Sequence, residues 1–277
     1  MANYTAADVK RLREETDAPM MECKNALEQA DGDFDKAKQI LRESGKAAAG
    51  KRADRATSAG VVAMAVHHDH NIVGAIVLES ETDFVARNED FIALAQEIAE
   101  IFLHNEPGDN PLAVKHGDTT VGEMIEAAVG TIRENIKLTK AVRLKSDNQL
   151  CTYVHHDRTK GSVVEITGDA DVREVGRSLA IQVVAFPPEV VSKDQLSQEM
   201  LAKELETETH RAINEGKPEN IAKNIAQGRV NKEFVNKVVL LEQPFYVDPS
   251  KSVSAYLKEV AKGVEVVSFV YLGVGLK

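Results

Sequence analysis

The feature that most constrains this chain is a pattern that occurs twice. The segment Val66–Asp69, with sequence VHHD, is followed by an apolar run at 74–78. A second VHHD at Val154–Asp157 is followed by another apolar run at 161–166. In each copy two β-rich runs flank a polar turn, and an amphipathic helical pattern follows. The repetition predicts an α+β fold with two related subdomains, each a small antiparallel sheet with helices on one side.

Helical patterns complete both copies. The helices predicted near 89–103 and 170–185 have apolar residues spaced for one buried face, and between them Thr120 and Glu123 form a capping box for a third helix. The apolar positions of the three are, in the same order, Phe91, Leu94, Ala95, Ile98, Ile101 and Phe102; Val172, Val175, Leu179 and Val183; and Met124, Ile125, Ala128, Val129, Ile132 and Ile136.

The last part of the chain returns to this core. A short helix is predicted near 253–262 and a final strand near 264–272. We therefore assign residues 61–140 to a first core subdomain and residues 141–277 to a second one. The second subdomain also holds a helical insertion.

The insertion, residues 189–230, is a predicted helical hairpin. A polar, helix-forming stretch begins at Ser192 with Gln195 as its capping partner and ends at Gly216, and Pro218 can start a return helix. This hairpin has too little apolar surface to be core, so we expect it to project as an arm for self-association or partner contact. The apolar residues of the return helix are Ile221 and Ile225.

Residues 1–45 precede the duplicated core and have the pattern of three short helices, the third of which is expected to stop at Gly45. A unit this small has little room for a buried catalytic site, so it predicts a binding module. Met20 and Met21 cannot both face inward on one helix, and Met suits adaptable contact surfaces. One of them is thus a candidate contact, unless one is core and the other incidentally exposed. Residues 46–60 are rich in Ala, Lys and Arg and predict a basic helical linker.

Charge and cysteine content exclude several classes of protein. The chain has 34 Lys and Arg against 44 Asp and Glu, a formal charge of −10, which argues against bulk electrostatic binding of nucleic acid. Two cysteines cannot staple 277 residues and are typical of a reducing, cytoplasmic setting. Neither a signal peptide nor a membrane-spanning apolar run is found, so no membrane partner is expected.

The remaining chemical motifs are weak. His67 and His68 could in principle ligate a metal, but adjacent residues of a strand point to opposite faces, so they could not readily share one ion if they lie in a strand. The same objection applies to His155 and His156. The GKAAAGK stretch at 45–51 lacks the Ser or Thr of a phosphate-binding loop and follows a helix. We expect no metal, no cofactor and no enzymatic activity; a metal-dependent enzyme built on the His pairs is the remote alternative.

One aromatic residue stands among charges where an apolar run meets a helix. Phe84 lies in the segment 81–88, with sequence ETDFVARN. Such a residue either packs on the following helix as a hydrophobic staple or projects as an exposed wedge. The pattern alone favours the staple.

The same segment resembles a signature of the bacterial translation elongation factor Ts family. Residues 20–24, MMECK, followed by Ala26 and Leu27, are similar to the family's other signature, at the expected N-terminal place. The resemblance extends over essentially the whole chain in the family's order. Further matches are Gly216–Pro218 with Ile221 and Ala222, Gly228 with Arg229, Gln243–Phe245, and Asp248–Ser250.

The resemblance implies a nucleotide-exchange factor for elongation factor Tu, in its GDP-bound and nucleotide-free forms. It also implies an N-terminal module like a ubiquitin-associated domain, a two-subdomain core and a projecting antiparallel coiled coil. In the family the Asp-Phe of the signature pushes into the GTPase beside its Mg²⁺ and phosphate site. Carried over, Asp83 and Phe84 make this contact with their neighbours Thr82 and Val85, and Phe84 becomes the wedge.

The resemblance adds further expected contacts. Met20, Met21 and Lys24 match the N-terminal surface that meets the GTPase domain in the family. Ile132 matches an apolar contact before the family's Glu-Asn-Ile, and Arg133 stands where the family usually has Gly. His155 matches a His that approaches the later domains of the GTPase.

Two questions stay open. The alternative function is an RNA- or ribosome-associated adaptor that would use the basic linker and the projecting arm, although no direct nucleic-acid binding is expected. A homodimer through the core or the hairpin is also possible.

Overall fold

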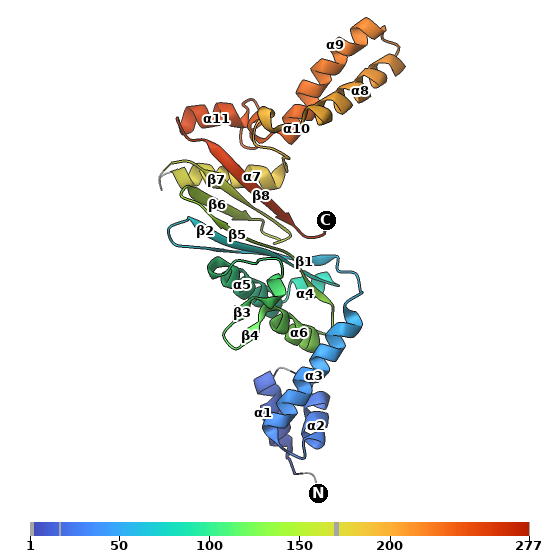
Figure 1. The fold of residues 1–277 in the computed structure, drawn as a ribbon, viewed down its shortest axis with the longest axis vertical. Coiled ribbons are helices and arrows are strands. Elements are labelled where there is room, and N and C mark those ends of the chain that lie inside the picture. The colour runs from blue at the N-terminus through green and yellow to red at the C-terminus, as the bar shows by residue number, and fades with distance from the viewer. Residues whose placement is uncertain (1–2, 17, 169–171, 277) are drawn as a thin grey trace.

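The computed structural model describes residues 3–16, 18–168 and 172–276 (Figure 1). The molecule is elongated, with the N-terminal helices at one end, two sheets in the middle and a helical pair at the other end. The N-terminal helices are α1 (Ala6–Thr16), α2 (Met20–Gln29) and α3 (Phe34–Arg52).

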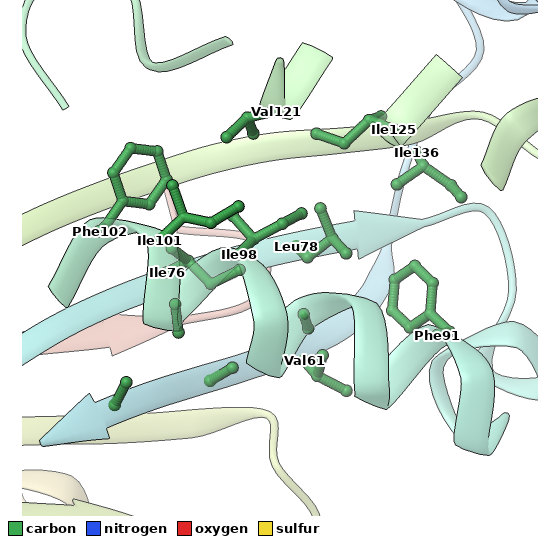
Figure 2. Packing of buried hydrophobic residues seen from close by; sticks show 14 of the residues in the cluster. Val61, Ile76, Leu78, Phe91, Ile98, Ile101, Phe102, Val121, Ile125 and Ile136 are labelled. Atoms are coloured by element: carbon green, nitrogen blue, oxygen red, sulfur yellow. The ribbon is translucent and has the colours of Figure 1, made fainter. Parts of the chain in front are cut away.

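The first sheet has strand order β1-β2-β5 and is antiparallel throughout. Two helices, α5 and α6, cover its outer face, and the buried face predicted near 89–103 is confirmed because Phe91, Ile98 and Phe102 are fully buried (Figure 2). The elements are β1 (Ala59–Val66), β2 (Ile72–Ser80), α4 (Asp83–Ala86), α5 (Glu89–His104), a short turn η1 (Pro111–Ala113), β3 (Lys115–His116), β4 (Thr119–Thr120), α6 (Val121–Ile132) and β5 (Ile136–Lys145).

The second sheet has strand order β6-β7-β8 and repeats the antiparallel arrangement. Helices α7 and α11 pack on its outer face around the buried residues Val164 and Leu179. The α+β fold class and the antiparallel sheets are thus confirmed. The elements of this half are β6 (Gln149–Val154), β7 (Lys160–Ile166), α7 (Arg173–Ala185), α11 (Val253–Val260) and β8 (Val266–Gly273).

The two sheets pack face to face, which the repeat did not predict. In β1, Val61 faces α5, whereas its neighbour Val62 faces the second sheet and joins Leu150, Val163 and Leu272 in a separate buried cluster. Each sheet is therefore covered by helices on one side and by the other sheet on the opposite side. Burial on both faces explains why the apolar runs are continuous rather than alternating.

The predicted stop of the third helix at Gly45 is wrong. The helix continues to Arg52, and Gly45 lies where α3 crosses α6: a Cβ built on Gly130 would be 3.2 Å from the Cα of Gly45. The glycine serves a close helix crossing rather than a helix end. The predicted linker at 46–60 accordingly starts as helix and runs into β1.

The third core helix also ends earlier than predicted. The capping box of Thr120 and Glu123 is confirmed, but α6 stops at Ile132 because Arg133 adopts a left-handed backbone conformation. Ile136 therefore belongs to β5 and not to the helix. That strand runs on across the boundary predicted at residue 140.

Two antiparallel helices, α8 (Gln198–Asn214) and α9 (Glu219–Arg229), project from the second half (Figure 1). The predicted start at Ser192 is wrong: the Ser192–Gln195 capping box opens only a short turn, η3 (Lys193–Gln195), and Ser197 caps α8. The segment after α9 continues as a π-helical turn, η4 (Val230–Val235), then α10 (Asn236–Val238) and η5 (Leu240–Glu242).

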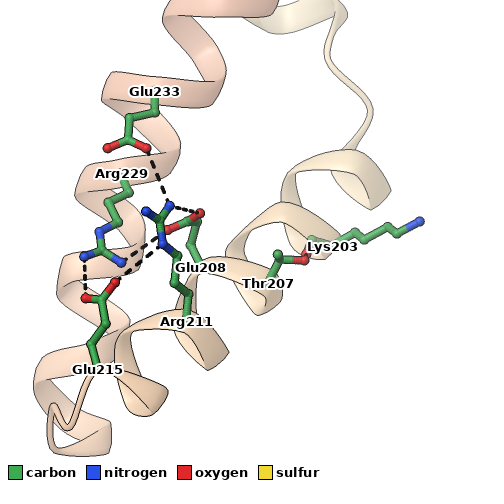
Figure 3. A network of polar contacts seen from close by, with 7 residues as sticks. All are labelled: Lys203, Thr207, Glu208, Arg211, Glu215, Arg229 and Glu233. Atoms are coloured by element: carbon green, nitrogen blue, oxygen red, sulfur yellow. Dashed lines mark hydrogen bonds and ion pairs between the residues drawn. The ribbon is translucent and has the colours of Figure 1, made fainter.

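The contact between α8 and α9 is made by alanines and ion pairs. Ala222 and Ala226 of α9 are fully buried, and their small side chains allow the two helices to approach closely. The predicted apolar residue Ile221 is exposed instead. Glu208 lies almost buried and pairs with Arg211 at 3.1 Å and with Arg229 at 3.4 Å (Figure 3). Among the described residues, no helix is long and apolar enough to cross a membrane.

Candidate partner-binding surface

Phe84 is held out into solvent on a one-turn helix. The helix α4 follows the end of β2, and its N-cap Thr82 accepts a hydrogen bond from the Val85 backbone N–H at 3.4 Å. Phe84 is 84% exposed, whereas Val85 packs against the first core and Ala86 is buried. The staple interpretation is therefore wrong, because Phe84 does not pack on the following helix. An exposed aromatic ring of this kind is a candidate contact for a partner, because aromatic residues are enriched at the cores of interfaces.

A short segment after α6 fixes this exposed turn. The backbone N–H and hydroxyl of Thr82 donate to the two carboxylate oxygens of Glu134 at 3.0 and 2.6 Å. The Ser80 hydroxyl donates to the Thr82 carbonyl at 3.0 Å. The Asn135 backbone N–H donates to Glu81 at 2.7 Å, and this bond is the main reason why the pKa of Glu81 is lowered. These four hydrogen bonds hold the turn that carries Phe84 in place.

Asn135 extends this scaffold to the end of α3. Its side chain is buried, and its amide donates to the carbonyls of Ala53 at 3.3 Å and Arg55 at 2.7 Å. Glu134 and Asn135 were not predicted as site residues. The usable signal was the Glu-Asn-Ile motif at 134–136, whose Ile136 pairs with Ser80 across the sheet.

Asp83 remains accessible beside Phe84. Its carboxylate pairs with Arg87 at 3.0 Å, one turn further along the chain, and both side chains are exposed. An exposed ion pair of this kind is worth little free energy, so the carboxylate is free to exchange partners.

The N-terminal helices present a second apolar surface. Met20 is 43% exposed and Met21 62% exposed, and Lys24 on the same helix is exposed as well. The interpretation that one of the two methionines belongs to the core is wrong. The buried cluster of these helices is formed by other residues, namely Val9, Leu12, Cys23, Ala26, Leu27, Ala30 and Ala37.

The two predicted residues at the end of α6 differ in environment. Ile132 is half-buried and packs against the first core, so little of it faces outward. Arg133 has a backbone φ of +71°, a conformation that costs a residue with a Cβ roughly 1 kcal/mol. Its guanidinium forms an ion pair with Glu22 on α2, next to Met21.

His155 lies elsewhere, in the turn between β6 and β7. It is half-buried, and its Nδ1 lies 3.1 Å from a carboxylate oxygen of Asp157. It belongs to the second sheet and shares none of the hydrogen bonds that hold Thr82 and Phe84.

The objection that adjacent strand residues point to opposite faces does not apply to His67 and His68. The strand β1 ends at Val66, and both histidines follow it in the turn. Their rings are 4.0 Å apart, and candidate ligand atoms of His67, His68 and Asp69 lie within 4.8 Å of one another. A metal-free chain stays a prediction. Cys151 is buried, and burial raises its thiol pKa to about 11, which makes it a poor nucleophile at neutral pH.

The exposed apolar side chains at α4 and at α2 are candidate contacts of a protein that acts by binding another macromolecule. Comparison with known proteins gives the family. A family model described as elongation factor TS matches residues 81–276. Elongation factor Ts of Clostridioides difficile (strain 630) is 38% identical over 272 residues, which cover 95% of this chain and 89% of the relative.

Two further relatives agree. Elongation factor Ts of Chloroherpeton thalassium is 41% identical, with 95% of this chain and 93% of the relative covered. Elongation factor Ts of Aeromonas salmonicida is 41% identical, with 99% and 92% covered. The chain therefore belongs to the elongation factor Ts family.

Proposed function

We propose that this chain releases guanine nucleotide from elongation factor Tu by inserting Asp83 and Phe84 beside the Mg²⁺ and phosphate site of that GTPase. Nucleotide exchange on elongation factor Tu during translation elongation is the function of the family to which the chain belongs. The observation that supports the insertion is the exposure of Phe84, 84%, on a turn held rigidly by Glu134.

The mechanism is differential binding. A factor accelerates release if it binds the nucleotide-free GTPase more tightly than the GDP-bound form. An aromatic ring that displaces groups at the Mg²⁺ and phosphate site raises the free energy of the bound state, and each ~1.4 kcal/mol removed from the barrier speeds release tenfold. By linkage, the returning nucleotide weakens the grip of the factor, so the complex turns over. No covalent chemistry is needed.

Rigidity matters for this mechanism. A wedge on a flexible loop would lose binding free energy to its own ordering. The hydrogen bonds of Thr82 to Glu134 and of Glu81 to Asn135 hold the turn before the partner arrives. Phe84 then keeps its position on binding and displaces groups of the GTPase.

The other predicted contacts fit the same partner. We interpret α1–α3 as a module like a ubiquitin-associated domain whose exposed face, Met20, Met21 and Lys24, meets the GTPase domain. We interpret α8 and α9 as the coiled-coil arm. His155, on the second half, suits a contact with the later domains. The site of action is the cytoplasm, where translation elongation takes place.

The test is release of a fluorescent GDP analogue from elongation factor Tu of the same organism. Phe84→Ala removes an aromatic contact of the kind that costs about 2 kcal/mol or more, so release should slow at least about thirtyfold. The matched control is Phe186→Ala, since Phe186 at the end of α7 is also exposed, at 53%. Circular dichroism must show that both variants are folded.

Each outcome is informative. Loss of acceleration in Phe84→Ala but not in Phe186→Ala supports the wedge. Acceleration that survives Phe84→Ala keeps exchange as the function and removes the wedge. No acceleration by the unmodified chain would favour the RNA- or ribosome-associated adaptor, whose affinity for RNA should fall steeply with salt.

A further inference from the structure

Arg133 combines an unfavourable backbone with a contact between two parts of the molecule. Its φ of +71° lies in the region that favours glycine, so the backbone alone does not explain an arginine here. Its side chain leaves the core and reaches α2, where the guanidinium pairs with Glu22. The Arg133 side chain is exposed and that of Glu22 is half-buried.

Apart from this pair, the N-terminal helices are joined to the core through α3, whose Arg42 pairs with Glu123 of α6 at 2.7 Å. The packing runs from α2 to α3 and from α3 to α6, where Gly45 and Gly130 approach. A cavity of about 460 Å³ lies between these helices and the core, and both Glu22 and Arg133 line it. The apolar cluster of the N-terminal helices contains no residue of the duplicated core. The tilt of α2 is therefore not set by a shared apolar interface.

The neighbours of Arg133 hold the other surface. Glu134 binds Thr82, the cap of the turn that carries Phe84. Glu22 follows directly on Met21. One short segment, residues 133–135, thus touches both apolar surfaces that the partner is expected to meet.

We propose that Arg133 is a positioning residue: its ion pair with Glu22 holds α2 at a set angle to α4, so that Met20, Met21 and Phe84 meet the GTPase as one preformed surface. The inference rests on the proposed function. Without the pair, α2 would be joined to the core mainly through its packing on α3, and its angle to α4 would have to be fixed on binding. The pair adds little to folding stability because it is half-exposed.

This role predicts that stability and affinity change in opposite directions. Arg133→Gly relieves the left-handed backbone, so its unfolding midpoint in urea should stay or rise. The same change removes the ion pair, so the KM for GDP-bound elongation factor Tu should rise about fivefold while kcat stays. Glu22→Gln should raise KM equally without touching that backbone, and the double variant should be no worse than either single one. A purely structural role would lower stability and activity together.

The angle itself is measurable without the partner. Spin labels at Glu28→Cys on α2 and Lys140→Cys on β5 replace exposed residues, while the two native cysteines are buried. The distance distribution should be narrow in the otherwise unmodified chain and broad after Arg133→Gly or Glu22→Gln. Glu14→Gln is the control, because Glu14 pairs only within α1 among the described contacts, with Lys10 at 3.6 Å.

The outcomes separate the two proposals. A narrow distribution in Arg133→Gly overturns the positioning role, as does a broad one with unchanged KM. Broadening with raised KM, in both single variants and not in the control, supports it. Broadening in a chain that never accelerates GDP release overturns the proposed function and leaves the structural link intact.

Discussion

The two halves of the core share a plan and differ in the segment after their second strand. In the first half β2 leads through Thr82 into α4, which exposes Phe84. In the second half the sequence between β7 and α7, residues 167–172, contains no aromatic residue. The duplication therefore supplies a scaffold twice, and the aromatic residue after the second strand is added to one copy only. This is the usual division between a packed core and the loops that carry function.

The halves also bring helix and sheet together by different means. In the first half the glycine is on the strand: Gly74 of β2 lies against the backbone of α5. In the second half it is on the helix: Gly176 of α7 lies against Cys151 of β6. In both halves a glycine allows the helix to approach the sheet, but it lies on the strand in one half and on the helix in the other. A Gly→Ala substitution should therefore have different consequences in the two halves.

The largest effect is expected for Gly74→Ala. A Cβ here would lie 2.3 Å from the carbonyl oxygen of Ala99 and 2.4 Å from the backbone nitrogen of Leu103. Backbone atoms of a packed helix cannot rotate away, so the free energy of unfolding should fall by about 3 kcal/mol, at the upper end for overpacking. Urea denaturation measures it. A loss below about 1 kcal/mol would show that α5 can shift, and the contrast between the halves would disappear.

Gly176→Ala should cost less, about 2 kcal/mol, because its Cβ meets mainly a side chain, the Sγ of Cys151 at 2.2 Å. Cys151→Ala removes that sulfur and should recover part of the loss. Cys151→Ala should not recover any of the stability lost in Gly74→Ala. This second combination is the matched control in a double-mutant cycle. If Cys151→Ala recovered the same free energy of unfolding in both glycine variants, the proposed difference between the two halves would be contradicted.

The projecting pair of helices is a feature of the second half alone, and its ion pairs can be broken separately. Glu208→Ala leaves Arg229 without one carboxylate in a partly buried position, which should cost about 1–2 kcal/mol locally. Hydrogen exchange should speed up in α8 and α9 while both sheets keep their protection.

The control for this local effect is Glu206→Ala on the same helix. The Glu206 side chain is exposed and, among the described contacts, pairs only with His210, at 3.9 Å. Loss of protection in the sheets after Glu208→Ala would mean that the arm and the core unfold as one unit.

The smallest effect concerns the two polar turns. The backbone N–H of Thr159, with smaller help from its hydroxyl and from His155, lowers the pKa of Asp157 from 3.8 to about 2. A lowered pKa stabilises the fold above the unfolded value near 3.8, and this stabilisation is lost as the pH falls through about 2. Because the carboxylate is partly exposed, the effect should stay below about 1 kcal/mol.

Asp157→Asn should thus destabilise at pH 6, and its difference from the unmodified chain should shrink as the pH is lowered from 5 to 2. Asp69→Asn in the first turn is the comparison. Among the described contacts, Asp69 faces two imidazoles and no Thr at the position of Thr159. If Asp157→Asn lost the same free energy of unfolding at every pH, the side chain would stabilise the turn through its shape rather than its charge.

By itself the sequence determined the elements that depend on neighbours along the chain. The duplicated turns, the buried face of α5, the Thr120 capping box and the final strand are local patterns, and all were predictable from spacing. The signature around Phe84 was visible as well. Local patterns decide what an element is, because periodicity and capping act within a few residues.

The tertiary structure decided which faces are covered. Gly45 stays inside a helix because it meets Gly130, far along the chain, and the two sheets bury each other's inner faces. Phe84 lies exposed on a turn whose cap, Thr82, is bound by Glu134 from beyond α6. Such contacts join residues distant in the sequence, and no local spacing encodes them. For this reason the sequence could identify the candidate wedge but not say whether it points into the core or into solvent.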